Sequence, residues 1–309
     1  MRRAAAWAVL LAALVSGCAA PQVAGLLEQL PPDLAASAEV AATPFYPQED
    51  YQCGPASLAA LLNHAGRDAT PESLVPQVYL PARQGSLQPE LLAATRRHAL
   101  VAYVLEPRLE ALLREIASGT PVLVLQNLAL DWAPQWHYAV AIGYDLGARR
   151  IILRSGVTER LAMSLDTFER TWTRGGGWAM VALPPGRLPV TASERGFLSA
   201  VASLERLHPV AAEQAYEAAL ARWPGSALAA LGLGNARYAR HDLSGAAASY
   251  RRATQLAPAS ADAWNNLAQA LSDLGRRDEA LGAARQAVAL GGPRLAAYRD
   301  TLAHIERAR

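Results

Sequence analysis

The stretch Gln52-Cys53-Gly54-Pro55-Ala56-Ser57-Leu58-Ala59-Ala60-Leu61-Leu62 places a cysteine directly before a Gly-Pro pair and an apolar run. Proline suits the first turn of a helix because its missing N–H is not needed there, so a helix is predicted to begin at Cys53. The positive end of the helix dipole favours thiolate over thiol at this position. Gly54 leaves room beside the cysteine for the backbone of another chain. Cys53 is therefore either a small buried hydrophobe or a reactive group.

A histidine lies in a second apolar run, Trp136-His137-Tyr138-Ala139-Val140-Ala141-Ile142-Gly143-Tyr144-Asp145. This run predicts a buried strand, followed by a turn and a further strand over residues 150–153. A lone histidine in a strand is usually a hydrogen-bonded core residue. A histidine on a sheet that faces a cysteine on a helix is instead the arrangement of papain-like thiol enzymes, in which the imidazole accepts the thiol proton.

The two segments that carry Cys53 and His137 together resemble the bacteriocin-processing peptidase C39 family. The similarity is strongest to C39-like lipoproteins that carry tetratricopeptide repeats, and it covers residues 43–183. The resemblance implies an α+β papain-like cysteine peptidase domain with a helix-borne cysteine and an antiparallel sheet that holds the histidine. It implies Cys53 as nucleophile, His137 as base and then acid, a peptide or protein substrate, and no metal or organic cofactor.

Two further catalytic candidates follow from this resemblance. Gln48 is the candidate donor to the oxyanion, but it lies one residue closer to Cys53 than the family pattern has it, so Gln52 and an ordinary loop glutamine remain alternatives. Ser155 best matches the place of an aspartate that orients the imidazole in the family. A serine hydroxyl accepts a hydrogen bond but carries no charge to stabilise an imidazolium, so either the activity is weaker or the third role lies elsewhere.

The N-terminus has the features of a targeting segment. Arg2 and Arg3 precede an apolar stretch over residues 4–15, and Ser16-Gly17-Cys18 follows. This ending resembles a lipobox, so Cys18 is the predicted site of lipid modification, with a plain secretory signal or an uncleaved anchor as alternatives. No acidic residue follows Cys18 directly. By resemblance to bacterial lipoproteins, we therefore expect a membrane anchor in the outer membrane, with the protein facing the periplasm.

The cysteine count bears on the role of Cys53, and the charge bears on the partners of the protein. The chain has 309 residues, 2 cysteines and a net charge of +2. If Cys18 is acylated, Cys53 has no partner within the chain, and a lone thiol in a secreted protein suggests a reactive group. The 29 basic residues are spread out rather than clustered, which argues against nucleic acid as a partner.

The second half of the chain contains a repeat with a constant offset of 34 residues, which aligns Ala230 with Trp264 and Leu233 with Leu267. This is the period of tetratricopeptide repeats, whose stacked helices present a concave face to a protein partner. The predicted organisation is a signal peptide over residues 1–18, a tether over 19–42, the C39-like domain over 43–183, a linker over 184–194, and repeats with a terminal capping helix over 195–309.

The loop over residues 84–87 is expected near the cleft by the same resemblance. Trp132 and Trp136 beside the candidate base either line a peptide-binding groove or cap the sheet. Three functions fit this sequence. The protein is a thiol peptidase, or a repeat scaffold with a catalytically weak or inactive C39-like domain, or an acyl transferase of transglutaminase-like type that uses the same acyl-enzyme.

Overall fold

The structure, a computed structural model, describes residues 20–48 and 52–307, and the chain divides into two compact units. The first unit runs to Leu183 and includes Pro189–Ala192, while the second holds Ser193–Arg309 with Pro184–Leu188 and Ala99–Val101. Cys18 and the predicted signal peptide lie outside the described residues. Within residues 20–48 and 52–307, no helix is both long enough and apolar enough to cross a membrane.

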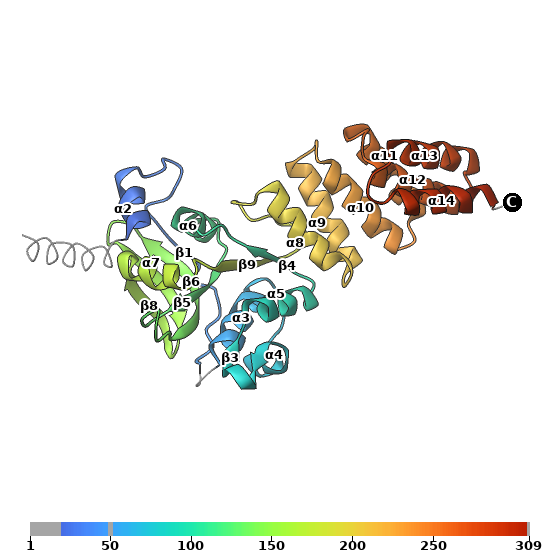
Figure 1. The fold of residues 1–309 in the computed structure, drawn as a ribbon. Helices are drawn as coiled ribbons and strands as arrows, with labels where there is room; N and C mark the ends of the chain where they lie inside the picture. The colour runs from blue at the N-terminus through green and yellow to red at the C-terminus, as the bar shows by residue number, and fades with distance from the viewer. Residues whose placement is uncertain (1–19, 49–51, 308–309) are drawn as a thin grey trace, which may run out of the picture. The chain divides into compact units, whose positions relative to one another are not determined.

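The first unit combines helices with an antiparallel sheet, as the sequence predicted. Figure 1 shows α3, α4 and α5 grouped together, and α2, α6 and α7 grouped on the opposite side of the sheet. In chain order its elements are α2 (Pro21–Glu28), β1 (Ser37–Glu39), α3 (Cys53–His64), α4 (Pro71–Val78), β2 (Tyr79–Leu80), the 3-10 turn η1 (Pro81–Arg83), β3 (Gly85–Ser86), α5 (Gln88–Arg97), β4 (Val101–Val104), α6 (Leu109–Ala117), β5 (Val122–Asn127), β6 (Trp136–Asp145), β7 (Arg150–Ser155), β8 (Thr158–Ser164), α7 (Leu165–Arg174) and β9 (Ala179–Leu183).

The sheet has the strand order β4-β9-β5-β6-β7-β8, and β1 pairs with the far end of β6. All six residues of β5 are buried, because helices cover both of its faces. This explains why the sequence of β5 is continuously apolar before Gln126 and Asn127. β6 is the longest strand and pairs with β5 over residues 136–141 but with β7 only from Val140 onward. The first residues of β6 therefore have one edge that β7 does not cover.

The helix α3 begins at Cys53, as predicted from the Gly-Pro pair. Its residues from Gly54 to Leu62 are all buried, and it packs against β5, β6, β7 and β9 as well as α4 and α5. Such an apolar helix is stable only inside a core, since burying one Leu side chain contributes about 1.5–3 kcal/mol. The first turn of α3 is thus fixed against the central strands.

The segment expected to be a tether is instead part of the folded unit. Glu169 on α7 accepts hydrogen bonds from the backbone N–H groups of Gln22, at 2.9 Å, and Val23, at 2.7 Å, in the first turn of α2. A carboxylate at a helix N-terminus satisfies otherwise unpaired donors and complements the helix dipole. β1 pairs with residues 143–145 of β6. Within the same segment, α2 begins at Pro21, which suits the first position of a helix.

The second unit consists of helices in consecutive pairs, in agreement with the predicted repeats. Its elements are α8 (Glu194–Glu205), α9 (Pro209–Arg222), α10 (Ala227–Ala239), α11 (Leu243–Leu256), α12 (Ala261–Asp273), α13 (Arg277–Leu290) and the terminal α14 (Leu295–Arg307).

Small residues allow these helices to approach closely. The Cα of Gly232 on α10 faces the ring of Tyr216, and a Cβ built there would lie 2.3 Å from that ring. Gly234 on the same helix faces the ring of Tyr250 at the same distance. The two tyrosines are 34 residues apart, and both pack against α10, Tyr216 from the preceding helix α9 and Tyr250 from the following helix α11.

Candidate active site

Cys53 lies against the uncovered edge of β6. The backbone N–H of Leu125 donates to Trp178 on the side of β9, so Leu125 and its partner Tyr138 do not exchange backbone hydrogen bonds. Tyr138 therefore directs its own backbone groups away from β5, toward the edge that β7 leaves open. There the backbone of Tyr138 hydrogen-bonds the Cys53 thiol. This contact places the cysteine beside the residue that follows His137.

The environment of Cys53 holds the thiol in its neutral form. Burial raises the pKa of the Cys53 thiol, and this effect outweighs the hydrogen bonds from the backbone of Tyr138, Gly54 and Cys53, which lower it. The backbone groups at the helix terminus thus lower the pKa of Cys53, in the direction predicted, but burial outweighs their effect. Cys53 is a free cysteine, and it needs a base to become a nucleophile.

His137 is fixed by Ser155, which lies at the end of the neighbouring strand. The imidazole Nε2 lies 2.8 Å from the Ser155 hydroxyl oxygen. The register of β6 and β7 shifts between Ala141 and Gly143, and that of β7 and β8 shifts between Leu153 and Ser155. Such irregularities turn a strand end and redirect its side chains. Ser155 thus occupies the place beside the imidazole where the family resemblance implies an aspartate.

This contact determines which ring nitrogen is available for chemistry. When Nε2–H donates to Ser155, the neutral ring carries its lone pair on Nδ1. Burial lowers the pKa of His137, so the ring is neutral and able to accept a proton. A direct hydrogen bond between Cys53 and His137 is not among the contacts of the described residues. Apo sites often tighten only when substrate binds, and in the tautomer that donates from Nε2–H to Ser155 the unprotonated ring nitrogen is Nδ1.

Gln48 lies along the helix face that carries Cys53. Its side-chain Nε2 donates to the hydroxyl of Ser57 at 3.4 Å, and Ser57 is one helical turn beyond Cys53. Its backbone N–H donates to the carbonyl of Gly156, next to Ser155. Gln52, the alternative, is the N-cap of α3 without a side-chain capping bond. The structure therefore brings Gln48, Cys53, His137 and Ser155 into one region of the unit.

The space beside Gly54 is occupied by the chain itself. A Cβ at Gly54 would lie 2.2 Å from the hydroxyl oxygen of Ser86. The segment that was expected to be a loop forms the short hairpin β2–β3, and the hydroxyl of Tyr138 donates to the carbonyl of Ser86 at 3.3 Å. Gly54 is needed for this close internal contact, which corrects the expectation that it makes room for another backbone.

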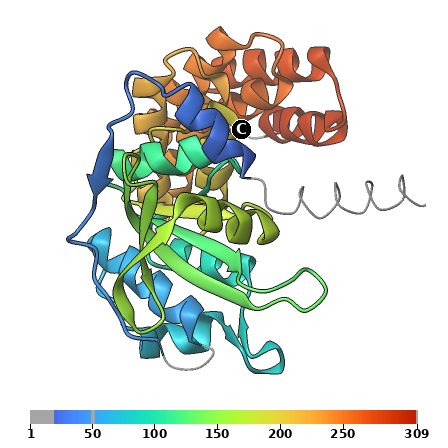
Figure 2. The ribbon, with the colours of Figure 1, turned by 90° about the vertical axis from the view of Figure 1, so that its left-hand side faces the viewer.

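The connection between β5 and β6 presents two tryptophans to solvent. Trp132 is 82% exposed and Trp136 55% exposed, so neither caps the sheet. The buried side chain of Asn127 orders this connection, because its oxygen accepts the N–H groups of Ala129, at 3.1 Å, and Gln135, at 3.0 Å. Figure 2 shows the hairpin, in green, projecting from the rest of its unit. It is an ordered apolar surface that begins at the residue before His137.

The sequence analysis did not identify Gln126 and Arg154, two buried polar residues near the site. The Arg154 guanidinium donates to the backbone carbonyls of Ala41, Thr43 and Glu159, and so holds the segment that leads to Gln48. Gln126 is the direct cross-strand partner of His137. In the sequence, each of these two residues is recognisable as a polar residue inside an otherwise apolar strand.

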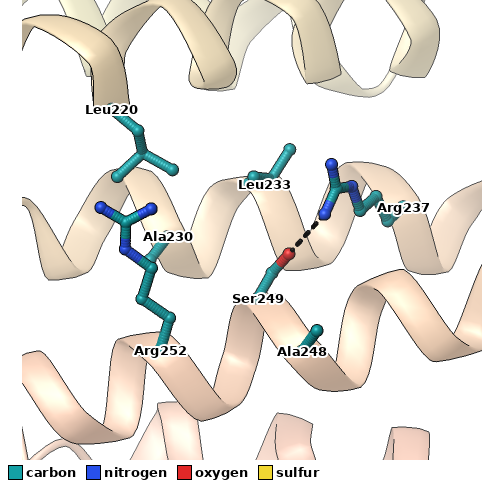
Figure 3. A pocket seen from close by; sticks show the side chains of 7 residues that line it. All are labelled: Leu220, Ala230, Leu233, Arg237, Ala248, Ser249 and Arg252. Carbon is teal, nitrogen blue, oxygen red and sulfur yellow. Dashed lines mark hydrogen bonds between the residues drawn. The ribbon is translucent and has the colours of Figure 1, made fainter. Parts of the chain in front are cut away.

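A second candidate site lies in the repeats. A hollow of about 200 Å³ is lined by Leu220, Ala230, Leu233, Arg237, Ala248, Ser249 and Arg252. Figure 3 shows the guanidinium groups of Arg237 and Arg252 on either side of Leu233, and Arg237 donates to Ser249 at 3.2 Å. This volume is below the range of small-molecule pockets, so the hollow suits a single side chain of a protein partner.

No group of three or more His, Cys, Asp or Glu side chains in the described part of the chain is arranged to hold a metal ion. The titratable groups at the site are instead a thiol and an imidazole on neighbouring elements. A cysteine at a helix N-terminus and a histidine on an antiparallel sheet, in an α+β domain, define the papain-like class of folds.

Comparison with known families gives a narrower assignment. Residues 40–180 match the model of the Peptidase_C39 like family, and residues 234–275 match a TPR (tetratricopeptide) repeat. These matches confirm the predicted C39-like domain followed by tetratricopeptide repeats. No protein with a curated description matches this sequence.

Solved structures similar to parts of the chain include the following three. A crystal structure described as a C39-like peptidase from Bacillus anthracis is 18% identical, with a TM-score of 0.42, and the alignment covers 48% of this chain and 97% of that one. Two crystal structures of MamA are 19% and 18% identical, each with a TM-score of 0.32. They cover 35% and 36% of this chain and 61% and 74% of their own chains.

Proposed function

We propose that this protein is a cysteine peptidase of the C39-like type, with repeats that bind a protein partner. The observation that carries the proposal is the position of Cys53 at the N-terminus of α3, hydrogen-bonded to the backbone next to His137, whose Nε2 is engaged by Ser155. This arrangement supplies a nucleophile, a base and an orienting group in one place.

The reaction proceeds through an acyl-enzyme. Nδ1 of His137 takes the proton from Cys53, and the thiolate sulfur attacks the scissile carbonyl carbon. The side-chain N–H of Gln48 turns from Ser57 to donate to the oxyanion. The imidazolium then protonates the leaving amine as the C–N bond breaks. Water, deprotonated by His137, hydrolyses the thioester and restores the thiol.

The exposed hairpin between β5 and β6 is the proposed contact for the leaving side of the substrate. Any peptide that lies across Cys53 and His137 passes next to Trp136, since Trp136 precedes His137 on the same strand. Leu128, Leu130 and Trp132 extend this exposed apolar surface along the hairpin. Aromatic side chains of this kind bind apolar peptide segments with little loss of conformational entropy.

A peptide library tests the proposal without knowledge of the natural substrate. The soluble chain that begins after Cys18 is incubated with peptides from a digested bacterial proteome, and new N-termini are identified by mass spectrometry. We expect cleavage by the native chain and a loss of about 10⁴-fold or more in both Cys53→Ala and His137→Ala, with His304→Ala on α14 as the unaffected control. New termini that persist in Cys53→Ala would exclude the mechanism.

A scaffold is the second candidate function, and one observation favours it. Ser155 offers no charge to an imidazolium, and the Cys53 thiol rests in its neutral form. If the protein is a scaffold, Cys53→Ala should leave its role in the cell unchanged. Arg252→Glu in the hollow of the repeats should instead abolish binding of the protein partner. Acyl transfer to an amine would use the same acyl-enzyme as hydrolysis, and it would yield a new amide product rather than a new N-terminus.

We further propose that Cys18 carries the lipid anchor and that the protein faces the periplasm from the outer membrane. Its support is the sequence of residues 2–18 alone. Metabolic labelling with an alkyne fatty acid tests it, because Cys18→Ala removes the label only if Cys18 is the acylated residue.

A further inference from the structure

We propose that Gln126 is a positioning residue for His137, and that its amide oxygen stabilises the imidazolium that forms when His137 takes the proton of Cys53. This inference rests on the proposed function, since it names the group that compensates for the missing aspartate. The starting observation is the register of β5 and β6, in which Gln126 and His137 lie directly opposite each other. Such cross-strand partners project from the same face, with Cβ atoms about 5 Å apart.

The amide of Gln126 contacts α7 and strand β8. Its Nε2 lies 3.9 Å from the sulfur of Met163 on β8. Strand β8 lies beyond both β6 and β7 in the sheet. The Gln126 amide therefore lies on the face of the sheet that contacts α7, and the cross-strand pairing puts His137 on the same face.

Hydrogen bonds fix the orientation of the Gln126 amide, because they determine which of its two ends binds Thr171. The Thr171 hydroxyl on α7 directs its proton to the backbone carbonyls of Thr167, at 3.1 Å, and Phe168, at 3.0 Å. Its oxygen can then only accept, and it does so from Nε2 of Gln126 at 2.6 Å. The amide nitrogen is therefore committed to Thr171, and the amide oxygen points elsewhere.

That oxygen is buried and without a partner among the described residues, while Gln126 as a whole is 0% exposed. Leaving a buried acceptor unpaired costs about 1–3 kcal/mol, so an acceptor of this kind is normally retained for a reason. A donor or a positive charge that appears only during the reaction supplies that reason. The imidazolium of His137 is such a charge.

Apart from the uncharged Ser155 hydroxyl at Nε2, the groups around this end of β6 do not provide an acceptor for the ring. Arg154 and Arg174 are cations that donate to backbone carbonyls, and Glu169 accepts the N–H groups of α2. Glu159 has an exposed side chain 3.7 Å from Arg154. The remaining groups are the neutral Cys53 thiol on α3 and the Tyr138 hydroxyl, which donates to Ser86. Gln126 is thus the buried acceptor opposite the ring.

Titration of His137 by NMR tests this role in the full chain labelled with ¹³C-histidine, with the signal assigned by its loss in His137→Ala. Gln126→Met keeps the length and apolar packing of the side chain but removes its dipole, so we expect the pKa of His137 to fall by about one unit. Gln126→Glu adds a negative charge and raises the same pKa by a similar amount. Gln77→Met on the surface of α4 is the matched control and leaves it unchanged.

An unchanged pKa of His137 in folded Gln126→Met and Gln126→Glu overturns the inference. If Gln126→Met does not fold, Thr171→Val releases the amide while preserving shape, and a pKa of His137 equal to that of the native chain then overturns it. The titration does not depend on peptide cleavage. A protein that fails to cleave peptides but shows these shifts therefore contradicts the proposed peptidase and not the interaction of Gln126 with His137.

Discussion

The two units of this protein place their charged residues in opposite ways. The C39-like unit buries Glu115, Arg154 and Glu169, each of which is less than a tenth exposed. In the repeat unit, the buried polar residues are the uncharged Ser226, Ser249 and Thr254, and ion pairs such as Arg251–Glu279 lie on the surface. A buried charge must be held by several hydrogen bonds, whereas a surface pair is worth little.

This difference in buried charge reflects which contacts determine the fold of each unit. The helices of the repeats meet through small residues, such as Gly232 and Gly234 of α10, which lie against tyrosine rings of the neighbouring helices. The C39-like unit depends on single polar side chains that join segments far apart in the sequence. Arg154 and Glu169 hold parts of the chain that precede Cys53.

Removing the charge of Arg154 gives the largest expected effect on stability. Arg154→Met leaves the carbonyls of Ala41, Thr43 and Glu159 without their donor, and we expect a loss of about 3 kcal/mol in the C39-like unit. The matched variant Arg251→Met removes an exposed arginine of the repeats and should cost less than about 1 kcal/mol. Hydrogen exchange measured peptide by peptide reports each unit separately. Equal losses in the two variants would contradict the contrast between the units.

Filling a glycine contact should destabilise the repeats by a smaller amount. Gly232→Ala forces a methyl group against the ring of Tyr216, and overpacking of this kind costs about 1–3 kcal/mol. Gly282→Ala on α13 meets nothing within 4 Å and should stabilise its helix by about 0.5–1 kcal/mol. Thermal unfolding of the two variants should move in opposite directions. A stabilising Gly232→Ala would show that the ring of Tyr216 yields easily.

Acid should destabilise the C39-like unit through its partly buried His137 and His98. This effect should be smaller than those of the Arg154 and Gly232 variants. Burial lowers the pKa of both His137 and His98 below the value of about 6.5 in the unfolded chain. The unfolded state therefore binds protons first as pH falls, and stability is lost below about pH 6.5. His137→Gln should reduce the loss of hydrogen-exchange protection between pH 7.5 and pH 5, while His304→Gln on α14 should not. An identical loss in native protein and His137→Gln would contradict this assignment.

Local patterns in the sequence predicted the parts of the fold that depend on local rules. The Gly-Pro pair located the start of α3, the apolar run around His137 located β6, and the period of 34 located the repeats. The place of Ser155 was implied by the family resemblance, and its hydroxyl lies beside the His137 ring.

Local sequence patterns did not predict the long-range contacts. Residues 20–42 resembled a tether because nothing nearby in the sequence shows that Glu169 binds the start of α2, 146 and 147 residues away. The occupied space beside Gly54 depends on Ser86, and the neutral state of Cys53 depends on how deeply α3 is buried. The proposed role of Gln126 depends on its pairing with His137 across β5 and β6, which the sequence alone does not show.

The raised pKa of Cys53 also bears on how readily this thiol is oxidised. Peroxides react with thiolates rather than thiols, so susceptibility to sulfenic acid formation follows thiolate character and exposure. A lone cysteine that is partly buried and kept protonated is oxidised slowly. The burial of α3 thus protects the Cys53 thiol from oxidation, and in the proposed mechanism this protection lasts until a base takes its proton.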